Sequence, residues 1–150
     1  MKFADISEVI AANAQHNERN ACTVIAVSNG AGLPYHVAHE MMAKAGRQPR
    51  HGFYFSQWMN FGCRRAEVSG EPFTLGAYKV TRVNLYAAGF PTLNQVSRDF
   101  KRGRFILCTR NHALAMIDGV IYDNAGTGAR ARIKNMYYLT DWSEGWRQYE

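Results

Sequence analysis

The sequence has few cysteines and no long apolar run. Its three cysteines, Cys22, Cys63 and Cys108, form neither a Cys-x-x-Cys pair nor an even set for a disulfide framework. This scarcity favours a reducing compartment over secretion. No apolar run approaches the ~20 residues that a membrane-spanning helix needs, and the first residues are too polar for a signal peptide. We therefore expect a cytoplasmic protein with no membrane partner.

Acidic residues are in the minority. Lys and Arg together number 18 against 12 Asp and Glu, which gives a net charge of +6. The excess lies in residues 98–134, which hold eight Lys or Arg and only three acids. A basic half suits an acidic ligand, nucleic acid or solubility alone. Because no known nucleic-acid-binding motif accompanies it, nucleic acid is a disfavoured partner.

The chain also contains no internal repeat, linker or low-complexity segment, and its 150 residues suit one domain spanning residues 1–150. Apolar spacing and capping signals predict helices near 6–14, 20–30, 34–45, 53–61 and 92–101. Strand patterns are found near 77–83 and 129–139, in addition to a hairpin within 103–124. This order predicts an α+β fold in which N-terminal helices pack on a C-terminal antiparallel sheet.

The hairpin organises the rest of the chain. Two apolar strands flank Asp118-Gly119, a dipeptide typical of type I′ turns because such turns need positive φ at both central residues. The returning strand would bring Asp123 or Asn124 back to the neighbourhood of His112. Either residue could then bind the second ring nitrogen of the histidine.

Cys22 is the candidate nucleophile for this histidine. It begins an apolar run, residues 21–28, that we expect to be a helix with Asn20 as its N-cap and the Ser-Asn-Gly at 28–30 near its end. In a first helical turn, free N–H groups and the helix dipole stabilise a thiolate. The alternative is that Cys22 is only a small buried hydrophobic residue. Cys108, inside a strand pattern, is expected to be core.

The order of nucleophile, histidine and acid resembles that of the papain-like cysteine peptidases. It is most similar to small, minimal members related to bacteriocin-processing peptidase domains and to short proteins of tailed phages. The segments that carry the resemblance are 20–26, 35–47, 92–100 with 103–107, and 112–123. The resemblance implies a papain-like fold in which Cys22 is the nucleophile, His112 the general base and acid, and Asp123 the orienting residue.

The same resemblance implies a thiol protease or amidase, a cysteine-dependent hydrolase of peptides or proteins that uses no cofactor. It further implies a viral protein encoded by a bacteriophage, working in the host cytoplasm or carried in the virion. Partners would be a peptide or protein substrate and phage or host proteins.

Two positions depart from the papain pattern. Papain has a glutamine six residues before its cysteine that helps form the oxyanion hole, but here that position is His16, and Thr23 replaces the following tryptophan. Gln15, Asn17 or Asn20 could substitute, with Gln15 preferred, beside the backbone N–H of Cys22. These departures support an alternative function: a catalytically weak or inactive papain-like fold acting as a virion structural component or a host-factor-binding protein.

Other polar and aromatic residues invite simpler interpretations. His36, His39 and Glu40 share one helix face but lack the His-Glu-x-x-His motif, so we expect a solvated face and no metal site. Arg130 and Arg132 alternate on a predicted strand and could hold an acidic substrate group, the alternative being a solvated edge strand. A run of aromatic residues is expected to be core and not a stacking platform: Phe53, Tyr54, Phe55, Trp58 and Phe61.

Overall fold

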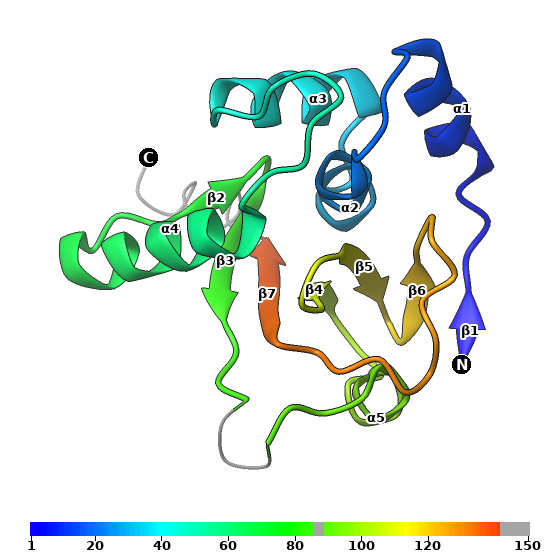
Figure 1. Cartoon of the computed structure of the whole chain (residues 1–150). Helices are drawn as coiled ribbons and strands as arrows, with labels where there is room; N and C mark the ends of the chain where they lie inside the picture. Colours follow the sequence, from blue (N-terminus) through cyan, green and yellow to red (C-terminus); the bar gives the residue numbers. More distant parts are fainter. Residues whose placement is uncertain (86–88, 142–150) are drawn as a thin grey trace.

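The computed structural model of the chain describes residues 1–85 and 89–141. The elements in chain order are β1 (Lys2–Phe3), α1 (Ser7–Gln15), α2 (Cys22–Ala31), α3 (Tyr35–Lys44), α4 (Phe55–Ser69), β2 (Thr74–Leu75), β3 (Tyr78–Arg82), α5 (Leu93–Asp99), β4 (Arg104–Cys108), β5 (Ala113–Ile117), β6 (Val120–Tyr122) and β7 (Asn135–Asp141). The fold is α+β, as the sequence predicts (Figure 1). No helix in the described ranges is long and apolar enough to cross a membrane.

The strands form one sheet in the order β1-β6-β5-β4-β7-β3-β2. The expectation of a purely antiparallel, C-terminal sheet is wrong. β1, at the N-terminus, pairs in parallel with β6, with Phe3 opposite Ile121, whereas the other pairs are antiparallel. A two-residue strand at the edge gave too little alternation to be recognised in the sequence.

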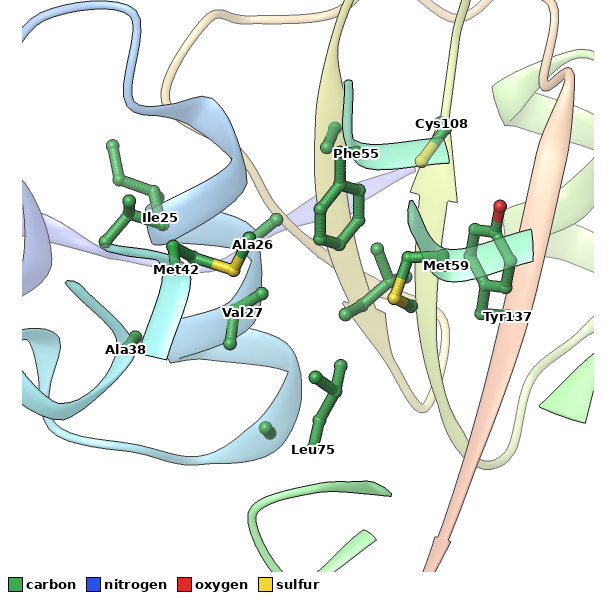
Figure 2. Packing of buried hydrophobic residues seen from close by; sticks show 14 of the residues in the cluster. Ile25, Ala26, Val27, Ala38, Met42, Phe55, Met59, Leu75, Cys108 and Tyr137 are labelled. Carbon is green, nitrogen blue, oxygen red and sulfur yellow. The ribbon is translucent and has the colours of Figure 1, made fainter. Parts of the chain in front are cut away.

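The two faces of the sheet carry separate hydrophobic clusters. Because side chains alternate along a strand, Phe105 and Leu107 of β4 pack with α5 on one face, while Ile106 and Cys108 pack with α2 on the other. Figure 1 shows α5 on the side of the sheet opposite α2 and α3. Figure 2 shows the α2 cluster extending from Met42 of α3, across Val27 of α2, to Met59 of α4 and Tyr137 of β7.

Helix α2 is the centre of that cluster and is buried on nearly all sides. Eight of its ten residues are buried, and α3 packs on it from the side away from the sheet. A helix that is apolar all round is stable only when other elements cover it completely. Close contact with the sheet depends on Gly30, since a Cβ there would lie 2.9 Å from Cγ1 of Ile106.

Two of the predicted helix ends are wrong for related reasons. α2 does not end at Gly30 but continues to Ala31, and Gly32 forms its left-handed C-cap. The helix predicted over 53–61 does not end before Gly62 either: α4 runs through Gly62 to Ser69, and Gly62 makes room for the ring of Phe73. Both glycines are packing contacts inside helices, a use that their sequence context does not distinguish from a helix end.

The segment predicted as one strand over 129–139 is also shorter than expected. Arg130 lies in a turn, Arg132 makes an isolated bridge with Thr92, and β7 begins only at Asn135. The alternation of Ala and Arg at 129–132 is therefore not a strand pattern, and the two arginines do not share a strand face. Arg132 instead donates to the carbonyl oxygen of Phe90 at 2.9 Å.

Candidate active site

The fold brings Cys22, His112 and Asp123 together from three places in the chain. Cys22 is the first residue of α2, His112 immediately precedes β5, and Asp123 immediately follows β6. β5 and β6 are joined by Asp118-Gly119, whose φ angles of 51° and 78° are both positive, as a type I′ turn requires. The hairpin therefore returns the carboxylate to the histidine.

His112 and Asp123 form a direct hydrogen bond. Nε2 of His112 lies 2.6 Å from Oδ1 of Asp123, and the aspartate side chain is fully buried. The other oxygen, Oδ2, accepts from the backbone N–H of Thr127 at 2.7 Å. Burial alone would raise the pKa of Asp123, but the hydrogen bonds from His112 and Thr127 outweigh it and hold the pKa well below its ordinary value. Asp123 is therefore ionised, and its carboxylate oxygens can only accept hydrogen bonds.

Because the carboxylate can only accept, Nε2 of His112 carries a proton, and Nδ1 is the nitrogen left for Cys22. Hydrogen bonds to Asp123 and to Cys22 raise the pKa of His112 to about 9. Burial by itself would raise the pKa of the Cys22 thiol, but hydrogen bonds from His112 and from the backbone at Ala113 and Thr23 lower it on balance. The two shifts act in the directions that favour a thiolate paired with an imidazolium.

The other two cysteines have the opposite character. Burial raises the pKa of Cys63 to about 11 and that of Cys108 to about 12. Cys108 is 2% exposed and belongs to the core, as predicted. Cys22 is thus the one cysteine whose surroundings favour the anion.

A cavity of about 530 Å³ opens beside Cys22 and His112. Three segments line it: the start of α2, the segment that leads into α4, and the loop between β4 and β5. The lining residues are Cys22, Thr23, residues 52–57 and residues 108–113. A carbonyl compound could therefore reach the sulfur in a cavity whose lining is largely aromatic in one segment and polar in another.

The prediction that the aromatic run belongs to the core is only partly confirmed. Phe55 is buried at 4% exposure and Trp58 packs against the core, but Tyr54 is 80% exposed and Phe61 is 59% exposed. Phe53, Tyr54 and Phe55 line the cavity. The helix that was expected from residue 53 begins at Phe55, so Phe53 and Tyr54 lie in the preceding loop.

The residues predicted for the oxyanion hole do not reach the cavity. Gln15 is the last residue of α1, is exposed, and is not among the lining residues. Asn17 and Asn20 adopt left-handed conformations, with φ of 50° and 54°, in the loop between α1 and α2. Asn20 does not cap α2 either, because the N-cap is Ala21 and no described side chain caps the helix. The side-chain amides that do line the cavity belong to Gln57 and Asn111.

Sequence reasoning missed the residue that fixes the loop before Cys22. Glu18 accepts from Nη1 of Arg47 at 3.0 Å, from Nη2 at 3.1 Å and from the backbone N–H of Arg50 at 2.7 Å. His39 also binds this carboxylate. The hydrogen bond from Arg47 is the main reason that the pKa of Glu18 falls to about 2. A single glutamate in a polar stretch carries no sequence signal for such a role.

His39 is therefore not on a solvated helix face, contrary to expectation: it is half-buried and bonded to Glu18, while His36 and Glu40 are exposed. Within residues 1–85 and 89–141, no group of three or more His, Cys, Asp or Glu side chains could hold a metal ion.

Comparison with protein-family models, curated proteins and solved structures finds no significant match for this chain.

Proposed function

We propose that this protein is a papain-like cysteine hydrolase that cleaves a peptide, isopeptide or other amide bond. The observation that carries the proposal is the connected set Cys22, His112 and Asp123 beside an open cavity. Acyl transfer by cysteine needs a thiolate, a base within hydrogen-bond reach of it and a group that orients the base, and these three residues can supply those roles. The wider resemblance of the sequence to papain-like peptidases supports the same proposal.

The proposed reaction has two halves. The Cys22 thiolate attacks the substrate carbonyl carbon, and the imidazolium of His112 gives its proton to the leaving amine as the C–N bond breaks. His112, now neutral, accepts a proton from water, whose oxygen attacks the thioester carbonyl; the C–S bond breaks and releases the carboxylic acid and the Cys22 thiolate, which restores the starting ion pair. Asp123 keeps the ring oriented and stabilises its positive charge in both halves.

The developing oxyanion also needs hydrogen-bond donors. The start of α2 has no side-chain cap, so we assign the backbone N–H of Cys22 to this purpose. Gln57 and Asn111 are the lining side-chain amides that could add a second donor. These two residues replace Gln15 in our assignment because Gln15 does not line the cavity.

Alkylation by iodoacetamide as a function of pH tests the proposal. In the wild type, we expect Cys22 to react at pH 6 about 100-fold faster than in His112→Ala, where the thiol should titrate near the ordinary value of about 8.5. Mass spectrometry locates the label, and the buried Cys63 and Cys108 are internal controls that should stay unlabelled. Equal rates in the two proteins at pH 6 would rule out an activating His112.

Binding without turnover is the second candidate, because the glutamine expected for the oxyanion hole does not reach the cavity. In that case the protein would act as a structural component or as a binder of another protein. Catalysis would require the sulfur of Cys22, whereas binding would not. A biological activity that survives Cys22→Ala would favour binding, and one that is lost would favour catalysis.

A further inference from the structure

We propose that the substrate carries a carboxylate close to the scissile bond and that Arg110 binds it; this inference rests on the hydrolase function proposed above. Arg110 lies in the loop between β4 and β5, two residues before His112, and lines the cavity. It is a different residue from Arg130 and Arg132, which the sequence suggested for an acidic group and which do not line the cavity.

The charges around the cavity favour an anion. The lining includes Arg110 and His112 but no aspartate or glutamate. The positive charge of His112 is already committed to Asp123 on one side and to Cys22 on the other. In the described residues no hydrogen bond, ion pair or ring contact engages the Arg110 side chain, which is exposed. Arg110 is therefore the cation that remains for a ligand.

The loop that carries Arg110 has a defined backbone. The N–H of Thr109 donates to the carbonyl oxygen of His112 at 2.9 Å, which closes a turn over residues 109–112. The same turn thus fixes the base and presents Arg110 beside it. A guanidinium on this turn, two residues before the base, can pair in a bidentate manner with a carboxylate on a residue near the attacked carbonyl.

The segment that leads into α4 adds a second preference. Phe53 and the exposed Tyr54 of this segment line the same cavity as Arg110. Aromatic surface of this kind covers apolar parts of a ligand and leaves polar groups to be bound elsewhere. The expected ligand is therefore a peptide with one carboxylate and an apolar neighbour. The carboxylate could be an aspartate or glutamate side chain or the C-terminus of the peptide.

The ratio of two alkylation rates measures the preference at Cys22. Iodoacetate is anionic and iodoacetamide is neutral, and they react with the same sulfur. We expect Arg110→Gln to lower the iodoacetate-to-iodoacetamide ratio about three- to fivefold, the size typical of an exposed charge pair. Arg110→Lys keeps the charge and should retain most of the preference. Arg98→Gln, on α5 at the opposite face of the sheet, changes the net charge equally and should leave the ratio unchanged.

The outcomes separate the two proposals. If the ratio is the same in Arg110→Gln, Arg98→Gln and the wild type, Arg110 does not bind the anion, whatever the absolute rate at Cys22. If Cys22 reacts slowly with iodoacetamide at pH 6 in the wild type, the proposed hydrolase function is ruled out. The proposal that Arg110 binds a carboxylate is then tested by the peptide-binding experiment below.

Binding to Cys22→Ala, followed by calorimetry, requires no reactive sulfur. The probes are three tripeptides with blocked N-termini. Two also have blocked C-termini and carry a central glutamate or a central glutamine, and the third has a central glutamine and a free C-terminal carboxylate. We expect one of the two anionic peptides to bind about three- to fivefold more tightly than the neutral peptide. Adding Arg110→Gln to the Cys22→Ala protein should remove that difference. Which anionic peptide binds identifies the source of the carboxylate. Equal affinity of all three peptides would overturn the proposal.

Discussion

The guanidinium of Arg47 donates to both carboxylate oxygens of Glu18, at 3.0 and 3.1 Å, in a pair whose side chains are each 2% exposed. The pair joins the loop before Cys22 to the loop after α3. The loop before Cys22 contains two asparagines in left-handed conformations, which cost free energy unless the surroundings hold them. The buried pair therefore positions the nucleophile without touching the cavity.

Glu18→Gln should destabilise the protein by about 3 kcal/mol, because it leaves the buried Arg47 without its counter-charge. Urea unfolding at pH 7 measures the effect. The matched control is Glu40→Gln, which removes an exposed partner of Lys44 by the same chemical change and should alter stability by less than about 0.5 kcal/mol. Equal losses of unfolding free energy in the two variants would show that the buried pair stabilises the protein no more than the exposed pair does.

The same pair predicts a loss of stability in acid. The pKa of Glu18 is about 2 in the folded protein, below its ordinary value of 4.5, so folding favours the ionised form. This contribution is fully present above about pH 4.5 and is lost as the pH falls through that value towards about 2. The difference in unfolding free energy between wild type and Glu18→Gln should therefore shrink over this range, and a constant difference would contradict the assignment.

Asp123→Asn should lower the pKa of His112 from about 9 by at least about one unit, because the neutral amide no longer stabilises the imidazolium. Titration of the imidazole by NMR reports the change. The control is Asn124→Ala, at the adjacent exposed residue, for which the midpoint should stay the same. This comparison also tests the choice of Asp123 over Asn124 as the orienting residue.

A consequence for stability follows from the raised pKa of His112. Its charged form stabilises the fold fully below the ordinary value of 6.5, and this contribution is lost as the pH rises through about 9. In Asp123→Asn the alkaline loss should therefore be smaller and should occur at lower pH. Denaturant unfolding between pH 6 and 10 measures both proteins.

Gly30→Ala should destabilise the protein by about 1 to 2 kcal/mol, although alanine is the better helix former by about 1 kcal/mol. The new Cβ would lie 2.9 Å from Cγ1 of Ile106, an atom near the backbone that cannot move aside easily. Gly128→Ala, with no atom within 4 Å of its new Cβ, is the control and should be close to neutral. Unfolding measures stability, and slower alkylation of Cys22 would report a displaced α2.

Local signals explain which parts of the fold and site were predictable. The Asp118-Gly119 turn and the Thr92–Gln95 capping box depend on residues a few positions apart, and both are present. The expected start of α2 near Cys22 is confirmed, although Asn20 does not cap it. The turn predicted that Asp123 or Asn124 would lie near His112, the family resemblance favoured Asp123, and Asp123 is the residue that binds the ring.

Features that depend on distant parts of the chain could not be predicted from local sequence signals. Glu18 and Arg47 are 29 residues apart and meet only because α3 folds back across α2. Gly30 and Gly62 look like helix ends until Ile106 and Phe73 are placed against them. Gln15 has the right residue type for an oxyanion donor and lies one position from the papain spacing, but it is exposed at the end of α1 and does not line the cavity.

The hairpin that joins His112 to Asp123 has a final consequence for the order in which the protein is built. These two residues are 11 positions apart, whereas Cys22 precedes His112 by 90. Contacts close in sequence form with little loss of chain entropy, so the imidazole and its carboxylate can meet early, and Cys22 joins them only when α2 docks on the sheet. Until then the cysteine remains an ordinary thiol with a pKa of about 8.5. We therefore expect Cys22 to react slowly with alkylating agents in an incompletely folded chain. Fast alkylation of Cys22 would then report that α2 has docked on the sheet.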